Sequence, residues 1–167
     1  MSGTVEEPVF RDRPTARVLL LDPGDRILLM KGRLPSAPSA PAAWFTVGGG
    51  VEPGETFLQA AAREIVEETG LVDFVLDRVV WRSEQILRDR KQRRVRFIEH
   101  FILARCAGGE PSRDGWQALE REFVDDIRWW ALPDLEVCTD LVFPRDLIVR
   151  LRRLLAGDPV DLLTGTD

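Results

Sequence analysis

Three glutamates crowd the stretch "AREIVEETG" at residues 62–70, and their spacing suits the binding of a cation. On a helix each residue advances about 100°, so Glu64, Glu67 and Glu68 would project from one side. Like charges at this spacing cost an exposed helix about 0.2–0.5 kcal/mol per pair. Mg2+ or Mn2+ would remove that cost, because such ions accept carboxylate oxygens and still bind water and phosphate. For the three glutamates alone, a solvated acidic helix face is the alternative.

The segment before the glutamates favours the cation. Glycines at 48–50 and Gly54 permit tight turns and a close approach of backbone to a ligand. Glu55 and Arg63 add fixed charge of both signs, and Arg63 lies four residues before Glu67, where it can hold that carboxylate. No histidine lies nearby to favour zinc or iron.

Together these residues resemble the Nudix box, the sequence signature of the Nudix hydrolase family. The box is Gly, five residues, Glu, seven residues, then Arg-Glu-apolar-any-Glu-Glu-any-Gly-apolar. Every fixed position is filled here, by Gly49, Glu55, Arg63, Glu64, Ile65, Glu67, Glu68, Gly70 and Leu71.

The resemblance implies a fold, an activity and a set of roles. The fold would be of the α/β (α+β) class, a Nudix-type α/β/α sandwich with a mixed central sheet. The activity would be metal-dependent hydrolysis of a nucleoside diphosphate linked to another group. Glu55 and Arg63 would orient the site. The implied ligands of Mg2+ or Mn2+ are the Gly48 carbonyl, Glu64, Glu67 and Glu68.

Hydrolysis also needs a base for the attacking water, and the sequence offers more than one. Glu64 is one candidate, and a downstream acid, Glu99 or Glu122, is another. Glu99 falls on the apolar face of an alternating segment, where an unpaired carboxylate is costly. The alternative for Glu99 is an ion pair with Arg94 or Arg105.

Other side chains are candidates for contact with phosphate or base. A basic run could contact the phosphates of a substrate, because guanidinium groups match phosphate oxygens. The alternative is that the run is a solvated hairpin tip. Its members are Arg88, Arg90, Lys91, Arg93 and Arg94. Three tryptophans could stack on a nucleotide base, although a tryptophan beside a strand is more often part of the hydrophobic core. They are Trp44, Trp129 and Trp130. His100 is interpreted as a structural strand residue.

The box needs elements that hold it in place. Helix formers at 56–69 predict a helix ending at Gly70, with its buried stripe at Leu58, Ala62, Ile65 and Thr69. Around it the pattern predicts further elements. These are a hairpin at 16–32, an extended segment at 44–47, strands at 75–87 and 94–106, a loop with a helical turn at 110–125, a short strand at 127–131 and a helix at 144–157.

Composition sets the class of protein. With 167 residues, 44% hydrophobic and 31% charged, we expect one domain, 1–167, with its core at about 14–156. Residues 34–43 are expected to be a flexible loop and 158–167 a frayed tail. A net charge of −5 argues against nucleic-acid binding. A cytoplasmic protein is expected, because the sequence has no apolar run long enough to span a membrane. Its two cysteines are far apart in the sequence and are interpreted as packing residues, which fits the same compartment.

The substrate is the least determined property. ADP-ribose pyrophosphatases of the family resemble one another in a proline after the box, and this chain has no proline from 72 to 110. Diadenosine polyphosphate hydrolases have a tyrosine in that region, and this chain has no tyrosine. We therefore expect a MutT-like hydrolase of a nucleoside triphosphate or related nucleotide. A nucleotide-sugar or ADP-ribose-like substrate, or a catalytically silent nucleotide sensor, is the alternative. An isopentenyl-diphosphate-isomerase-like enzyme is disfavoured, because neither cysteine has a recognisable motif. A homodimer is expected by analogy.

Overall fold

The computed structural model describes residues 10–89, 91–159 and 164–165. Its helices are α1 (Phe57–Thr69), α2 (Ala118–Phe123), α3 (Leu132–Glu136) and α4 (Leu147–Leu155). Its strands are β1 (Arg11–Leu21), β2 (Ile27–Gly32), β3 (Ala43–Gly50), β4 (Phe74–Arg88), β5 (Arg94–Cys106), β6 (Val124–Trp130), β7 (Leu141–Phe143) and β8 (Thr164–Gly165).

One mixed sheet organises the described residues. The strands run in the order β6-β2-β3-β1-β5-β4-β8, and β7 pairs with β3 off this path. β1 is central, antiparallel to β3 and parallel to β5 along its whole length. The β4–β5 hairpin is long and antiparallel, with irregular register near Val79. The sequence had not indicated that β1 and β5 are neighbours, because their pairing is parallel and distant along the chain.

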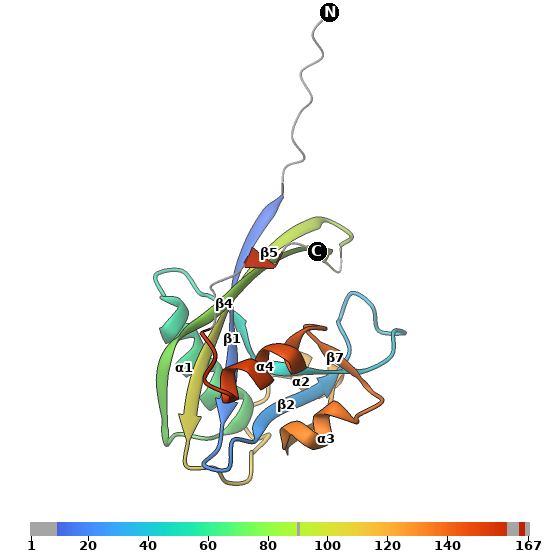
Figure 1. The fold of residues 1–167 in the computed structure, drawn as a ribbon. Coiled ribbons are helices and arrows are strands. Elements are labelled where there is room, and N and C mark those ends of the chain that lie inside the picture. Colours follow the sequence, from blue (N-terminus) through green and yellow to red (C-terminus); the bar gives the residue numbers. More distant parts are fainter. Residues whose placement is uncertain (1–9, 90, 160–163, 166–167) are drawn as a thin grey trace, which may run out of the picture.

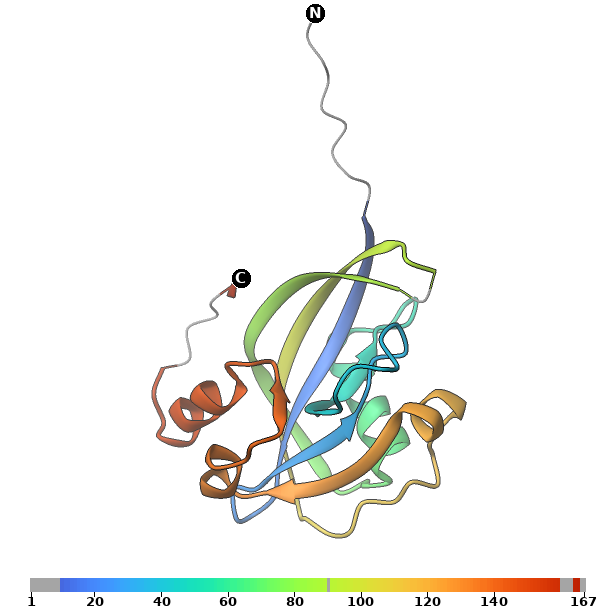
Figure 2. The ribbon, with the colours of Figure 1, turned by 90° about the vertical axis from the view of Figure 1, so that its right-hand side faces the viewer.

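Helices cover both faces of this sheet (Figure 1), and Figure 2 shows α1 and α2 on one side with α3 and α4 on the other. Side chains alternate between the faces of a strand, so each strand feeds two cores. Ala16, Val18 and Leu20 of β1 pack with α1. Leu19 and Leu21 pack with α4. The predicted α/β/α sandwich with a mixed sheet is confirmed.

Helix α1 begins and ends where the sequence predicts. The Thr56 side chain accepts a hydrogen bond from the Gln59 N–H and the Gln59 side chain accepts one from the Thr56 N–H, which is a capping box. Gly70 ends the helix in the left-handed conformation.

The predicted buried stripe of α1 is wrong in part. Leu58 is 43% exposed, whereas the carboxyl side chain of Glu68 is buried. The side chains that face the sheet are Ala60, Ala61, Ile65, Glu68 and Thr69. The helix is rotated so that its acidic side partly faces the backbone of β3, and apolar periodicity alone could not reveal this rotation.

The remaining elements agree closely with expectation. The 16–32 hairpin, the strands at 75–87 and 94–106, the short strand after α2 and the C-terminal helix are confirmed, with every end within five residues of its predicted position. Residues 34–42 contain turns and no helix or strand. Thr164–Gly165 pairs with β4, and 160–163 and 166–167 of the predicted frayed tail lie outside the described residues. No helix of the described residues is long and apolar enough to cross a membrane.

Candidate functional site

The glycine triplet ends strand β3 rather than forming a free loop. Gly48 has φ of 141°, which only glycine adopts readily, and a Cβ there would overlap the Ala16 carbonyl oxygen. At Gly49 a Cβ would collide with the carboxyl group of Glu64. The glycines therefore let the helix α1 acids approach the strand backbone directly.

Arg63 gathers most of the acidic side chains around one guanidinium group. Its Nε and Nη2 donate to the two carboxyl oxygens of Glu55 at 2.9 and 3.0 Å, and Nη2 also donates to the Gly50 carbonyl at 2.9 Å. Nη1 donates to Glu64 at 2.7 Å and to Glu67 at 3.2 Å. Hydrogen bonding to Arg63 lowers the pKa of Glu55 to about 2. The predicted Arg63–Glu67 contact is confirmed, and Glu55 is the partner that holds Arg63 most firmly.

Glu68 and Glu64 occupy less favourable surroundings for a charge. The Gly48 N–H donates to Glu68 Oε2 at 2.8 Å. Burial, reinforced by the neighbouring Glu64 carboxylate, raises the pKa of Glu68 well above its ordinary value. Burial also raises the pKa of Glu64, with Arg63 opposing the change and Glu67 reinforcing it. These two carboxyl groups are the ones that a nearby cation would stabilise most.

Glu120 on α2 joins this cluster and was missed in the sequence. Its negative charge acts on both Glu64 and Glu68. Its Oε2 is buried and has no hydrogen-bond partner among the residues that the structure describes. The indole N–H of Trp116 donates to the Glu68 carbonyl at 2.7 Å and fixes the loop that leads into α2. The only hint in the sequence was a glutamate in a short helical turn, and its placement depends on this loop.

The side chains present fit a hard divalent cation by their chemistry. Three carboxyl groups, those of Glu55, Glu64 and Glu67, pair with a single guanidinium. In addition, one oxygen of Glu120 is buried without a partner among the described residues, which is costly unless a cation or water completes it. Among the described residues, however, no three such groups already converge as a ligand set. Arg63 holds one oxygen of Glu64 and the Gly48 N–H holds one of Glu68. Binding would therefore require these carboxyl groups to turn.

The structure does not bring the two other predicted acids to the cluster. Glu99 lies on the opposite face of the sheet, where Arg17, Ser83 and Gln85 donate to its oxygens at 2.8, 3.0 and 2.9 Å. Its ion-pair partner is Arg17 rather than Arg94 or Arg105, because parallel pairing with β1 places it beside that strand. Glu122 is exposed on α2 and, in the described part of the chain, has no recorded contact with the cluster.

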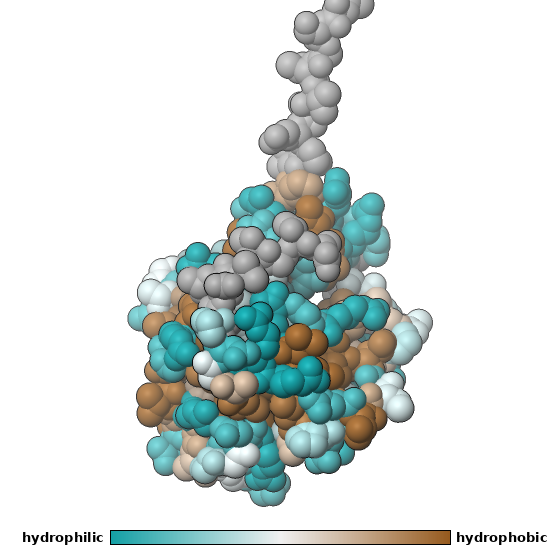
Figure 3. All heavy atoms as spheres, in the orientation of Figure 1, coloured by the Kyte–Doolittle hydropathy of each residue, from teal (hydrophilic) through white to brown (hydrophobic). Residues whose placement is uncertain are grey.

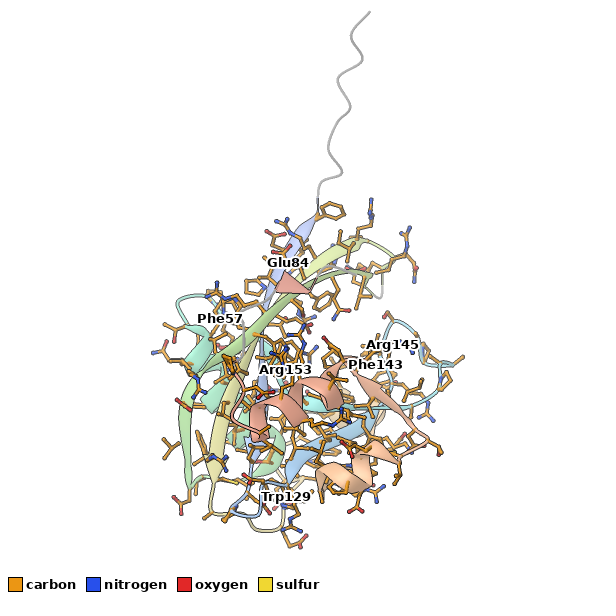
Figure 4. All side chains as sticks on the ribbon, viewed as in Figure 1. Phe57, Glu84, Trp129, Phe143, Arg145 and Arg153 are labelled. Carbon is orange, nitrogen blue, oxygen red and sulfur yellow. The ribbon has the colours of Figure 1, made fainter. Side chains whose placement is uncertain are left out.

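A pocket of about 270 Å3 lies on the α4 face, between β4, β5 and the β7–α4 corner. Glu99 forms part of its floor, and Trp81 and Phe143 are its aromatic side chains. Glu84 of β4 also lines this pocket, as do Phe143 and Arg145 at the corner, and all three are labelled in Figure 4. Figure 3 shows this side of the molecule, where hydrophobic side chains are exposed among hydrophilic ones. A flat, partly polar group fits such a lining.

The tryptophans singled out in the sequence do not line this pocket. Trp44 is fully buried and its indole donates to Asp140, so it cannot stack on a ligand. Trp130 packs edge-on against Trp44, and Trp129 donates to the Gly109 carbonyl. Trp129 is labelled far from Phe143 in Figure 4.

Two other interpretations from the sequence can be compared with the structure. His100 stacks on Phe57 at the start of α1, with ring centroids 3.6 Å apart, in agreement with a structural role. In the arginine-rich turn, Arg93 pairs with Asp89 and Arg88 donates to the Gln92 carbonyl. Arg90 lies outside the described residues. Contact between this turn and substrate stays a prediction.

The described residues form a mixed sheet between two helical layers, in which a strand that ends in glycines faces an acidic helix, and this arrangement defines the class of protein as a three-layer α/β sandwich. The NUDIX domain family matches residues 11–151. The chain belongs to the NUDIX family.

Similar proteins agree with this assignment. The oxidized purine nucleoside triphosphate hydrolase of Danio rerio is 30% identical over 134 residues, which cover 74% of this chain and 81% of that protein. The structure of a MutT protein from Methanosarcina mazei has a TM-score of 0.63 at 18% identity, covering 91% of this chain and 99% of the other. A MutT NUDIX hydrolase from Burkholderia pseudomallei has a TM-score of 0.56 at 26% identity, covering 86% and 98%.

Proposed function

We propose that the protein is a divalent-metal-dependent hydrolase that cleaves the diphosphate linkage of a nucleoside triphosphate. The observation that carries the proposal is the cluster of Glu64, Glu67, Glu68 and Glu120 against the glycine end of β3. Family membership supports the reaction class. The similarity to the oxidized purine nucleoside triphosphate hydrolase of Danio rerio supports a purine triphosphate, oxidised purines included.

The roles of the residues follow from their surroundings. Glu64, Glu67, Glu68 and the Gly48 carbonyl would hold Mg2+ or Mn2+, and Glu55 keeps Arg63 in place behind them. Such an ion, when bound, would polarise phosphate oxygens and lower the pKa of a bound water. Glu120 would accept the proton of the attacking water, which is supported by its buried Oε2 having no hydrogen-bond partner among the described residues. A new P–O bond then forms as the bridging P–O bond breaks.

The pocket on the α4 face is proposed to hold the nucleoside part of the substrate. It borders Glu99, which bonds to Arg17, and Arg17 lies opposite Gly48 in the strand register. Pocket and acidic cluster are therefore at the same end of the sheet. Binding of the nucleoside there would leave the phosphates to reach the glycine end of β3.

The test is a panel of nucleotides assayed for cleavage of the phosphate linkage, with the products separated by chromatography, with and without Mg2+. The panel would contain normal and oxidised purine and pyrimidine triphosphates, ADP-ribose and a UDP-sugar. We expect hydrolysis of a triphosphate that requires Mg2+ or Mn2+. Glu64→Gln should lower kcat by about 100-fold or more, because the variant loses a charge at the reacting phosphate.

Glu52→Gln is the matched control, because Glu52 is an exposed glutamate in the loop before α1. It should leave kcat unchanged. Cleavage only of ADP-ribose or the UDP-sugar would correct the substrate class. Tight binding of a nucleotide without cleavage under any metal condition would refute the hydrolase and favour a nucleotide-binding role.

A further inference from the structure

Two arginines of β1 lie on the pocket side of the sheet, next to the glycine end of β3. In the register of the strands, Arg17 is opposite Gly48, and Arg13 is beside Phe97 of β5. Residues paired directly across a sheet project from the same face. Arg13 and Arg17 therefore share the face of Glu99 and the pocket. The acids of α1 approach the same glycines from the other face.

Arg17 is held in place by the pocket floor. Its Nε donates to Glu99 Oε1 at 2.8 Å, and Glu99 is 2% exposed. Ser83 and Gln85 donate to the other oxygen of Glu99, so the carboxylate is fully engaged. The two terminal nitrogens of Arg17 make no hydrogen bond to any of the described residues. The Arg17 side chain is 24% exposed, which leaves this end accessible to a ligand.

Arg13 makes no ion pair with an acidic side chain within the described part of the chain. Its guanidinium lies over the Phe97 ring, 5.4 Å from the ring centre. Its Nε and Nη2 lie 3.6 and 3.7 Å from the point that a Cβ of Gly50 would occupy. Burial and the positive charges of Arg17 and Arg11 lower the pKa of Arg13, while Glu64 acts in the opposite direction. Arg13 is nevertheless exposed, so its guanidinium is accessible to a ligand.

We propose that Arg13 and Arg17 bind the phosphate groups of the substrate between the pocket and the acidic cluster, and that Glu99 is a positioning residue for Arg17. Guanidinium groups match phosphate oxygens in shape and charge. They would also offset the repulsion between the phosphates and the α1 carboxylates. The proposal rests on the proposed function and assigns the phosphate contacts to β1 rather than to the arginine-rich turn at 88–94.

The test measures binding of inorganic pyrophosphate in the presence of Mg2+ by calorimetry, which requires no turnover. Arg13→Gln should weaken binding by about tenfold or more, and Arg13→Lys should restore part of it. Arg105→Gln is the matched control, because Arg105 forms an exposed ion pair with Asp25 at the other end of β1. The control should bind as the wild type does.

Arg17 needs a paired design, because its removal alone leaves Glu99 buried without a counter-charge. The double variant Arg17→Gln with Glu99→Gln removes both charges and should also weaken pyrophosphate binding by about tenfold. Glu99→Gln alone keeps the guanidinium and should weaken binding less. With the substrate that the panel identifies, it should raise KM more than it lowers kcat, which a purely structural defect would not do selectively.

Two readouts separate this proposal from the proposed function. Mn2+ affinity without phosphate should not fall in either arginine variant, because the arginines make no ion pair with the α1 acids in the described residues and removing a nearby positive charge does not weaken cation binding. Wild-type binding of pyrophosphate by Arg13→Gln, or no pyrophosphate binding by the wild type, would overturn the proposal even if a nucleotide is cleaved. Loss of binding in the variants would support it even if no nucleotide in the panel is cleaved.

Discussion

At the scale of single residues, Glu68 combines burial with a raised pKa. The unfolded chain loses this proton near the ordinary value of 4.5, whereas the folded chain keeps it to higher pH. Ionisation therefore favours the unfolded state as the pH rises above about 4.5, and the cost is complete above the folded pKa. The residue proposed to bind the cation weakens the protein when no cation is present.

We therefore predict that Glu68→Gln raises the melting temperature at pH 7. A gain of about 1 kcal/mol would correspond to roughly 2–4 °C for a chain of this size. A glutamine can still accept the hydrogen bond from the Gly48 N–H, so the fold should persist. The gain should vanish near pH 4, and turnover should be lost. Calorimetry at the two pH values checks this, and equal melting temperatures at pH 7 would contradict it.

Manganese gives the complementary measurement. The wild type should gain melting temperature on addition of Mn2+, because a ligand that binds only the folded state stabilises it. Glu68→Gln should gain less. An equal gain in both proteins would show that Glu68 takes no part in binding the metal.

At the scale of elements, α1 depends on the cap at its start. Thr56→Ala should lower the free energy of unfolding by about 1 kcal/mol, because the Gln59 N–H loses its acceptor. Thr139→Ala, at an exposed threonine between α3 and β7, is the matched control and should change stability by less than about 0.5 kcal/mol. Urea unfolding measures both, and equal effects would exclude a capping role.

Local patterns in the sequence predicted these elements well because their causes are local. The Thr56 cap, the Gly70 stop and the alternation in β5 act between near neighbours. The rotation of α1 was not predictable from helical periodicity, because it follows from contact between the helix and the bare backbone of another element, at Gly48 and Gly49 of β3.

For the candidate site too, the sequence predicted the contacts between residues that are close along the chain and missed those between distant residues. The acids of the box lie within a few residues of one another, and the structure places them together around Arg63. Glu120 and Arg17 join by long-range packing, which a single sequence does not encode in any short motif. Glu99 was correctly placed on the apolar face, but its partner depends on the parallel neighbour of β5.

At the scale of the whole molecule, one sheet supports two hydrophobic cores. Ile65 anchors α1 on one face and Leu151 anchors α4 on the other, and both are fully buried. Each side chain packs against residues of the shared strands, so the two cores should not unfold independently.

We predict that Ile65→Ala and Leu151→Ala each lower the free energy of unfolding by about 2–5 kcal/mol. Leu58→Ala and Val149→Ala are matched controls on the same helices, at side chains that are 43% and 52% exposed, and should cost far less. Within each variant, circular dichroism and tryptophan fluorescence should report the same urea midpoint as each other. Separate midpoints would show that the two helical layers unfold one at a time.

The parallel pairing of β1 with β5 bears on how the protein is made. Each residue of β1 pairs with one 84 positions later, as Asp12 does with Arg96. A ribosome adds about 5–20 residues per second, so the first strand waits several seconds for its neighbour. During that interval the apolar run Val18–Leu21 is without one of its two flanking strands. The nascent chain therefore has a window in which a chaperone, or another unfinished copy, competes for the middle of its future sheet.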